Sequence, residues 1–223
     1  MLHLDKLEGF GELSDSLIEE INSIGKMKIF QKGMFAIDCD DLLKYFYIVI
    51  SGSIKVFVYS PEKDKEQTLY VLQSRDLFDV LTVLDGKPHE VYTKALEHSE
   101  VLELPIERVR EWIKTNPAFN KAFFPYLAKR MREVEELAAD LSLHDTSTRL
   151  MKLLLKNIDK SVKNFPLIHN LSHEDIASMI GSVRQVVNRQ LQELKKEGII
   201  NIRRKQIAVN DLNKLLLKIS SKQ

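Results

Sequence analysis

Polar side chains that can read DNA bases gather in one short stretch near the C-terminal end of the chain. They are Arg184, Gln185, Asn188 and Arg189. Arginine presents a planar pair of donors that fits two acceptors on guanine, while glutamine and asparagine bond adenine bidentately. The spacing places all four on one face of a helix. The stretch predicts a helix that reads the major groove, and the competing interpretation is an ordinary solvated helix face.

The residues just before this helix predict a helix-turn-helix. Ser172 and Asp175 have the spacing of a reciprocal cap at the start of a first helix, and Gly181 supplies the turn because glycine tolerates a left-handed backbone. Ser182 and Gln185 predict a second cap, and Ser182 is also a candidate DNA contact. The buried side of the second helix is expected to contain the apolar residues Val183, Val187, Leu191 and Leu194.

A basic hairpin is expected after the second helix, over residues 199–209. Its tip is formed by Arg203, Arg204 and Lys205, which suit contact with phosphates. The charge balance agrees, because residues 145–223 hold 15 Lys and Arg against 7 Asp and Glu, a net charge of +8. Residues 1–144 hold the remaining 18 against 25, a net charge of −7. A basic C-terminal domain is expected if it meets nucleic acid.

A long helix is predicted over residues 118–143, with apolar residues that alternate by three and four. This stripe consists of Phe124, Leu127, Met131, Val134, Ala138 and Leu141. Such spacing is typical of the seam of a two-stranded coiled coil, so it predicts a homodimer interface. The competing interpretation is a helix that packs on its own N-terminal domain.

Short apolar runs between residues 27 and 104 predict a β-barrel or sandwich, because turn residues separate them at close intervals. A short helix capped by Ser14 precedes them, residues 34–37 are expected to form a strand, and Ser51-Gly52 is expected to make a tight hairpin. The expected class is α+β. The domains are a sensing β-barrel domain (1–115), a dimerisation helix (116–144) and a DNA-binding domain (145–223), with a hinge at His144-Asp145, where Asp145 caps a helix that runs to Ile158.

Several classes of protein are excluded or disfavoured by composition. Hydrophobic content of 44% and charged content of 29% are ordinary for a globular protein, and no apolar run reaches the ~20 residues of a membrane span, so a cytoplasmic protein is expected. The single cysteine, Cys39, excludes an intrachain disulfide and is predicted to be inert. Motifs of hydrolases, phosphate-binding loops and zinc proteases are absent, so no enzyme is expected. His169 and His173 have a metal-like spacing but no third ligand, and no metal site is expected.

Nearly the whole chain resembles the family of cyclic-AMP receptor and FNR-type bacterial transcription regulators. The resemblance rests on Phe30-Gln-Lys-Gly33, on Tyr47 to Val56, and most specifically on the C-terminal winged helix-turn-helix. It implies a homodimer with an N-terminal jelly-roll barrel of the cyclic-nucleotide-binding kind, a long dimerisation helix and a winged helix-turn-helix that binds palindromic promoter DNA. It also implies base contacts by Arg184, Gln185 and Arg189, although the family often has glutamate in place of Gln185. The loops 61–66 and 160–165 lie where activating members touch RNA polymerase.

The sensor region departs from the family pattern. Cyclic-nucleotide binders hold the ribose with a Gly-Glu pair and the phosphate with an Arg-Ser or Arg-Thr pair, whereas this chain has Asp79-Val80 and His89-Glu90 at those places. A carboxylate repels an anion, and the bidentate arginine is missing, so cyclic AMP is not expected as the effector. The FNR-type cysteine cluster is absent too, and one cysteine cannot by itself hold an iron–sulfur cluster.

Two alternatives for the signal stay open. Some family members hold haem, for which His89 or His98 would serve as axial ligand, in a pocket lined by the apolar residues Val80, Leu81, Val83 and Leu84. The other alternative is a regulator that is active without any ligand. A different function is also open, namely an effector-binding regulatory subunit that uses its C-terminal domain to dock on a partner protein.

Overall fold

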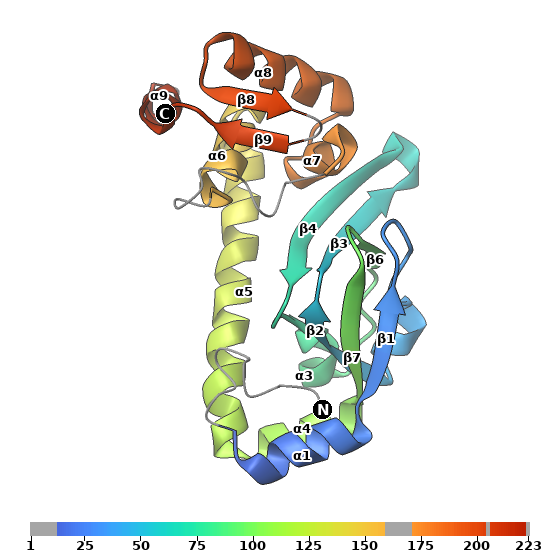
Figure 1. Ribbon diagram of the computed structural model, residues 1–223. Coiled ribbons are helices and arrows are strands. Elements are labelled where there is room, and N and C mark those ends of the chain that lie inside the picture. The colour runs from blue at the N-terminus through green and yellow to red at the C-terminus, as the bar shows by residue number, and fades with distance from the viewer. Residues whose placement is uncertain (1–12, 159–170, 204–205, 222–223) are drawn as a thin grey trace. The chain divides into compact units, whose positions relative to one another are not determined.

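The computed structural model describes residues 13–158, 171–203 and 206–221 (Figure 1). Contacts within the chain divide it into two units. The first lies within residues 1–58 and 69–135, and the second within residues 59–68 and 136–223. None of the described helices is both long enough and apolar enough to cross a membrane.

Two β-sheets form the centre of the first unit. The four-stranded sheet has the order β1 (Lys26–Phe30), β7 (Ser99–Pro105), β2 (Tyr45–Ser51) and β5 (Leu77–Phe78). The three-stranded sheet has the order β4 (Lys65–Gln73), β3 (Ser53–Ser60) and β6 (Tyr92–Ala95). Strands β2 and β7 pair antiparallel, with Tyr47 opposite Glu103, so residues far apart in sequence meet in the middle of the sheet.

Strand β2 is buried on both faces because its side chains alternate between two cores. Tyr47 and Val49 belong to the core between the two sheets, together with Ile54 and Val56 of β3. Phe46 and Ile48 belong to the second core, on the other face of the sheet. Side chains point to opposite faces at successive positions of a strand, which explains the continuous apolar run of β2.

Helices cover the second core. They are α1 (Asp15–Ile24), α4 (Ile106–Thr115) and the first turns of α5 (Pro117–Leu143), which lie at one end of the strands (Figure 1). Ser14 caps α1 by accepting a hydrogen bond from the backbone N–H of Leu17, as predicted. Trp112 and Phe119 lie with ring centroids 5.9 Å apart, and Phe119 stacks on Phe123 at 5.6 Å. The contact of Trp112 with Phe119 fixes the start of α5 against α4.

Some expectations for this unit were wrong. Ser51-Gly52 is not a hairpin, because β2 and β3 belong to different sheets and the chain changes sheet at this point. Gly52 is required there, since it has φ +84° and a Cβ would lie 2.4 Å from the His98 carbonyl. Residues 34–37 form only an isolated bridge, between Phe35 and Lys94. Strand β5 and the short helices α2 (Cys39–Leu42) and α3 (Val80–Asp85) were not predicted.

The second unit contains the predicted helix-turn-helix and hairpin. Its elements are η2 (Pro61–Lys63), α6 (Thr146–Lys156), α7 (His173–Met179), α8 (Arg184–Lys196), β8 (Ile200–Arg203), β9 (Gln206–Val209) and α9 (Leu212–Ser220). Asp145 caps α6 as predicted, with Thr148 N donating to its carboxylate at 2.7 Å, although α6 ends two residues before Ile158. The core consists of buried aliphatic side chains, among them Leu150, Leu154, Ile176, Val187, Leu191 and Leu215.

Candidate functional site

Helix α7 begins with the reciprocal cap that the sequence predicts. The hydroxyl of Ser172 accepts a hydrogen bond from Asp175 N at 3.0 Å, and the Asp175 carboxylate accepts one from Ser172 N. The helix is followed by Gly181 at φ +63°, where a Cβ would lie 2.6 Å from the Leu141 side chain. Both the backbone conformation and the close approach demand glycine, so this turn cannot be altered without moving α8.

The start of α8 differs from the prediction by one residue. Val183, not Ser182, is the N-cap residue, and it makes no side-chain capping bond. The reason is that Ser182 belongs to the preceding turn, where its N–H donates to the Ala177 carbonyl at 2.9 Å. Val183 is 48% exposed, so the expectation that it is buried was wrong. The remaining apolar positions, Val187, Leu191 and Leu194, are buried as expected.

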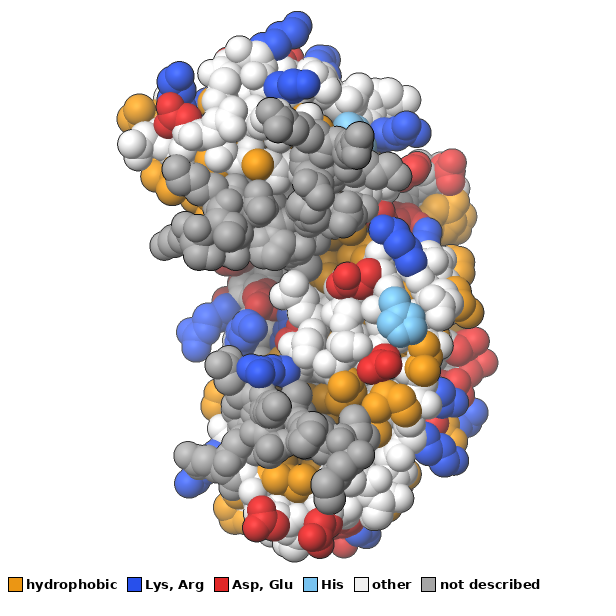
Figure 2. All heavy atoms as spheres, viewed as in Figure 1, with side chains coloured by type: hydrophobic (Ala, Val, Ile, Leu, Met, Phe, Trp, Pro, Cys, Tyr) orange, Lys and Arg blue, Asp and Glu red, His pale blue; other side chains and the backbone are white. Residues whose placement is uncertain are grey.

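The outward face of α8 carries the predicted base-reading side chains. Arg184, Gln185, Asn188 and Arg189 are all exposed. The side chain of Arg189 is 70% exposed, and its contact with Glu193 is loose, at 3.9 Å. Exposed pairs of this kind contribute little, so Arg189 can turn toward a base edge at low cost. Figure 2 shows lysine and arginine side chains over the surface that α8 forms.

The hairpin of β8 and β9 follows α8 as predicted. Ile202 pairs with Ile207 and Arg203 pairs with Gln206. Arg204 and Lys205 lie outside the described residues, as do the side chain of Arg203 and the loop 160–165. The contact of this basic tip with phosphates therefore stays a prediction.

The tip of the β3–β4 hairpin belongs to the second unit and contacts its helix-turn-helix. The hydroxyls of Thr68 and Ser178 lie 2.8 Å apart and are buried. The ammonium group of Lys65 donates to the carbonyl of Gly181 at 2.9 Å, in the turn before α8. Lys65 lies in the loop 61–66, which is predicted to contact RNA polymerase, and it is thus bound to a group of the chain itself. No local pattern in the sequence indicated this contact.

Packing within the chain leaves most of the apolar stripe of α5 exposed. Phe124, Met131, Val134 and Ala138 are exposed, Met131 by 58%, whereas Phe119 and Phe123 near the start of the helix are buried. Leu127 and Leu141 are partly buried. Intrachain packing thus accounts for the first turns of α5 but not for the stripe. Apolar side chains repeated along one exposed helix face favour a partner helix.

A buried carboxylate, that of Asp79, stands where the sequence comparison places the ribose-binding pair of cyclic-nucleotide binders. Asp79 is buried and caps α3, accepting hydrogen bonds from Leu81 N at 3.2 Å and from the Thr82 hydroxyl at 2.6 Å. His89 Nδ1 lies 2.9 Å from the same carboxylate, without the angles of a hydrogen bond. The donors that would hold an anion are thus already satisfied.

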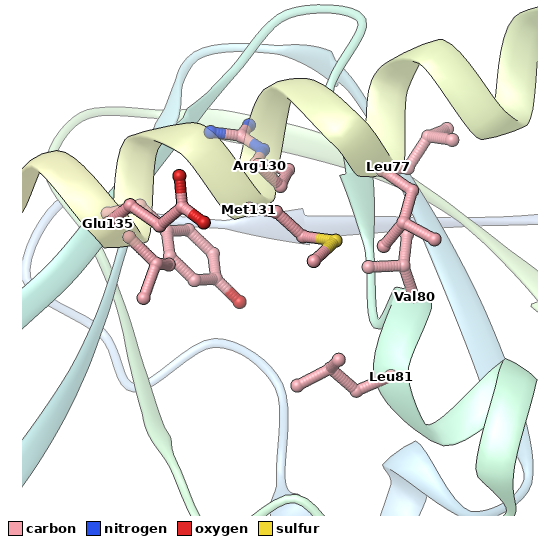
Figure 3. A pocket seen from close by; sticks show the side chains of 9 residues that line it. Leu77, Val80, Leu81, Arg130, Met131 and Glu135 are labelled. Carbon is pink, nitrogen blue, oxygen red and sulfur yellow. The ribbon is translucent and has the colours of Figure 1, made fainter.

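A cavity of about 320 Å³ lies between α5, α3 and the strands β4 and β5, all within residues 69–135 of the first unit. Its lining consists of Tyr70, Leu77, Val80, Leu81, Leu127, Arg130, Met131, Val134 and Glu135. Figure 3 shows the side chain of Met131 extending from α5 toward Val80. Of the four apolar residues predicted to line a pocket, Val80 and Leu81 do so, Val83 lies in the buried core, and Leu84 is exposed.

The two histidines proposed as haem ligands do not line this cavity, as far as the described residues show. His89 pairs with Asp79 instead. His98 is exposed, and its Nδ1 lies 3.4 Å from the amide oxygen of Gln31. The structure therefore brings Asp79 and His89 together, but it leaves both histidines outside the lining of the cavity.

Arg130 is the main polar group at the cavity wall, and no local sequence pattern indicated its role. Its Nη2 lies 2.6 Å from Asp76 Oδ2, its Nη1 donates to Glu133 at 2.6 Å, and its Nε donates to the Tyr126 hydroxyl at 2.7 Å. Its charged group also lies 5.3 Å from the ring centroid of Tyr70. Burial opposes its charge, but Tyr126, Asp76 and Glu133 outweigh burial and raise the pKa of Arg130.

The ligand atoms of Asp38, Cys39 and Asp40 lie within 4.8 Å of one another, all on exposed residues. Partial desolvation, followed by a hydrogen bond and the negative charge of Asp38, raises the pKa of the Cys39 thiol. A thiol with a raised pKa is a weak nucleophile and a weak metal ligand, and the inertness of Cys39 stays a prediction.

In a comparison with known proteins, both units match domains that occur in one family. Residues 27–116 match the cyclic nucleotide-binding domain, and residues 148–217 match the Crp-like helix-turn-helix domain. A global nitrogen regulator of Nostoc is 31% identical over 171 residues, which cover 74% of this chain and 76% of that protein. The chain belongs to the CRP/FNR family of transcription regulators.

A further relative and a solved structure are similar over most of the chain. A CRP-like cAMP-activated global transcriptional regulator of Mycobacterium tuberculosis is 26% identical over 173 residues, which cover 76% of this chain and 77% of that protein. Among solved structures, a mutant of CooA from Carboxydothermus hydrogenoformans aligns with a TM-score of 0.77 at 22% identity, covering 98% of this chain and 96% of that chain. The CRP/FNR fold of the present chain, with its nucleotide-binding-like domain, long helix and helix-turn-helix, agrees with the expectation from sequence.

Proposed function

We propose that this CRP/FNR regulator binds an inverted-repeat DNA site as a homodimer, with an affinity that is set by a signal in its N-terminal domain. The proposal rests on the distribution of buried and exposed side chains on α8. Its inner side is anchored by buried Val187, Leu191 and Leu194, while Arg184 and Arg189 are exposed on the outer side. A rigid helix with exposed arginines is what major-groove reading requires.

The exposed stripe of α5 supports the dimer. Pairing of two copies along Phe124, Met131, Val134 and Ala138 would hide apolar side chains that the single chain leaves exposed. Two α8 helices that enter successive major grooves must lie about 34 Å apart. Helix α5 ends at Leu143 and α6 begins at Thr146, so a small rotation at His144-Asp145 would re-aim α8 and change the DNA affinity.

The signal that we propose is neither a cyclic nucleotide nor haem. The buried Asp79 carboxylate would repel a phosphate, and the donors around it are already used. The haem site expected from the sequence used His89 or His98 as axial ligand, and neither histidine is among the described residues that line the cavity. An absorbance spectrum of freshly purified protein tests this directly, since a Soret band would contradict it.

Salt dependence separates DNA binding from the alternative of a protein dock. Each phosphate contact contributes a slope of about −0.9 to log K against log salt concentration. We expect a steep negative slope with a labelled duplex, because α8 and the predicted hairpin tip carry several cations. The absence of any DNA binding between low and physiological salt would contradict the proposed function. It would favour the alternative in which the C-terminal domain docks on a partner protein.

A further inference from the structure

The cavity beside α5 is lined mainly by apolar side chains, unlike a site for anions. Six of its nine lining residues are aliphatic or thioether side chains, namely Leu77, Val80, Leu81, Leu127, Met131 and Val134. Its volume of about 320 Å³ falls within the range of small-molecule sites, about 300–1,000 Å³. A cavity of this composition gains affinity mainly by removing apolar surface from water.

Arg130 is the only cation among the described residues of the cavity wall, and its charge is already paired. Arg130 contacts two carboxylates, those of Asp76 and Glu133, each at 2.6 Å. The side chains of Arg130 and Asp76 are only 11% and 15% exposed, so water screens this cluster weakly. Glu133 also has a loose contact with Lys129 at 3.9 Å, and Glu135 adds a further carboxylate to the lining. An anionic ligand would therefore meet a guanidinium already held by two carboxylates, with a third carboxylate beside it.

We infer that the cavity binds a neutral, apolar small molecule, of about the size of a few fused or linked rings, and that Asp76 and Glu133 exclude anionic ligands by holding Arg130. This inference deepens the proposed function by naming the class of effector, and it rests on the sensor role proposed above. The cavity then selects against carboxylates and phosphates, cyclic nucleotides included, through charge, and selects for apolar compounds through its aliphatic wall.

Two fluorescent probes that differ by one charged group test the class of ligand. N-Phenyl-1-naphthylamine is neutral, and 1-anilinonaphthalene-8-sulfonate is the same molecule with a sulfonate. We expect the full-length protein to bind the neutral probe saturably and at least tenfold more tightly than the anionic probe. Equal affinities, or tighter binding of the sulfonate, would overturn the inference.

A matched pair of substitutions on α3 tests the location. Leu81 lines the cavity and Leu84 does not, while both side chains are exposed enough to be enlarged without disturbing the core. Leu81→Trp is expected to reduce affinity for the neutral probe at least tenfold, and Leu84→Trp is expected to leave it within twofold. Equal effects of the two variants would place the probe elsewhere and overturn the inference.

A third variant tests the role of the carboxylates. Glu133→Gln leaves Arg130 with one carboxylate, so affinity for the sulfonate probe is expected to rise at least threefold while affinity for the neutral probe stays unchanged. An unchanged sulfonate affinity would contradict the exclusion mechanism. If the partner's α5 filled the cavity instead, the wild-type protein would bind neither probe, which also overturns the inference. These titrations contain no DNA, so their failure is distinct from a failure to bind duplex DNA.

Discussion

The guanidinium of Arg130 on α5 and the carboxylate of Asp76, in the turn before β5, approach to 2.6 Å in a nearly buried setting. Tyr126 adds a second link at the same place, because its hydroxyl donates to the Leu77 carbonyl at 2.9 Å and accepts from Leu77 N at 3.0 Å. The long helix is thus attached to the sensor sheet by polar contacts beside the cavity. Changes in the cavity have a direct physical route to α5.

Replacing Arg130 tests the strength of this attachment. Arg130→Met leaves two carboxylates without their cation, so we expect the free energy of unfolding to fall by about 2–3 kcal/mol, somewhat less than for a fully buried pair. Urea denaturation measures the change. Arg132→Met, at an exposed position of the same helix, is the control and is expected to change stability by less than about 0.5 kcal/mol. Similar losses of unfolding free energy in both variants would show that the ion pairs of Arg130 do not stabilise the fold.

Neighbouring alanines on α5 provide a clean test of the dimer seam. Ala138 belongs to the stripe and Ala139 does not, both are exposed, and neither lines the cavity. Ala138→Glu places like charges across the seam and is expected to yield monomers in sedimentation, with weak DNA binding, and Met131→Glu should act in the same way. Ala139→Glu should remain dimeric. A dimeric Ala138→Glu variant would mean that the interface lies elsewhere.

Arg189 and Lys205 are predicted to contribute differently to DNA binding. Arg189→Ala should cost about 1–3 kcal/mol on the preferred site and relax base preference at one position, because a base contact is lost. Lys205→Ala should weaken binding to all sequences alike and make the salt dependence shallower. Competition assays with specific and random duplexes measure both effects. Equal losses on the two duplexes for Arg189→Ala would refute its assignment as a base-reading residue.

His173, at the start of α7, is predicted to make stability depend on pH. Burial, followed by the charge of Arg184, lowers the pKa of His173 below its ordinary value of 6.5. Below pH 6.5 the unfolded chain therefore binds this proton more readily than the folded chain, so stability falls as pH drops through 6.5. Urea unfolding at pH 7.5 and pH 5.5 should show a smaller loss for His173→Gln than for the wild type. An equal loss would exclude His173 as the cause.

Local signals predicted most of the DNA-binding unit correctly. The Ser172–Asp175 cap and the Gly181 turn depend on residues within a few positions of one another, so their chemistry can be recognised in the sequence. The error at Ser182 also comes from reading local spacing. Ser182 and Gln185 have the spacing of a cap, but Ser182 belongs to the turn before α8, so Val183 becomes the N-cap residue. The exposed reading face of α8 followed from helical spacing alone.

Long-range pairing accounts for what the sequence did not reveal. Ser51-Gly52 has the composition of a hairpin, but β2 pairs with β7 and β5, so the turn becomes a corner between sheets. Arg130 lies next to the apolar stripe and has the pattern of a solvated charge. Only the fold brings Asp76 to it, and the cavity beside it is likewise formed by residues of α3, α5 and two strands that no local pattern connects.

The central claim is that two copies of the chain pair along α5 and present their α8 helices to one duplex. The most direct measurement is selection of duplexes by the full-length protein from a randomised library, followed by determination of the binding stoichiometry. We predict enrichment of an inverted repeat with half-sites about 10 base pairs apart, or a multiple of that spacing, and two chains bound per duplex. Recovery of no inverted repeat, with equal affinity for selected and scrambled duplexes, would contradict the claim.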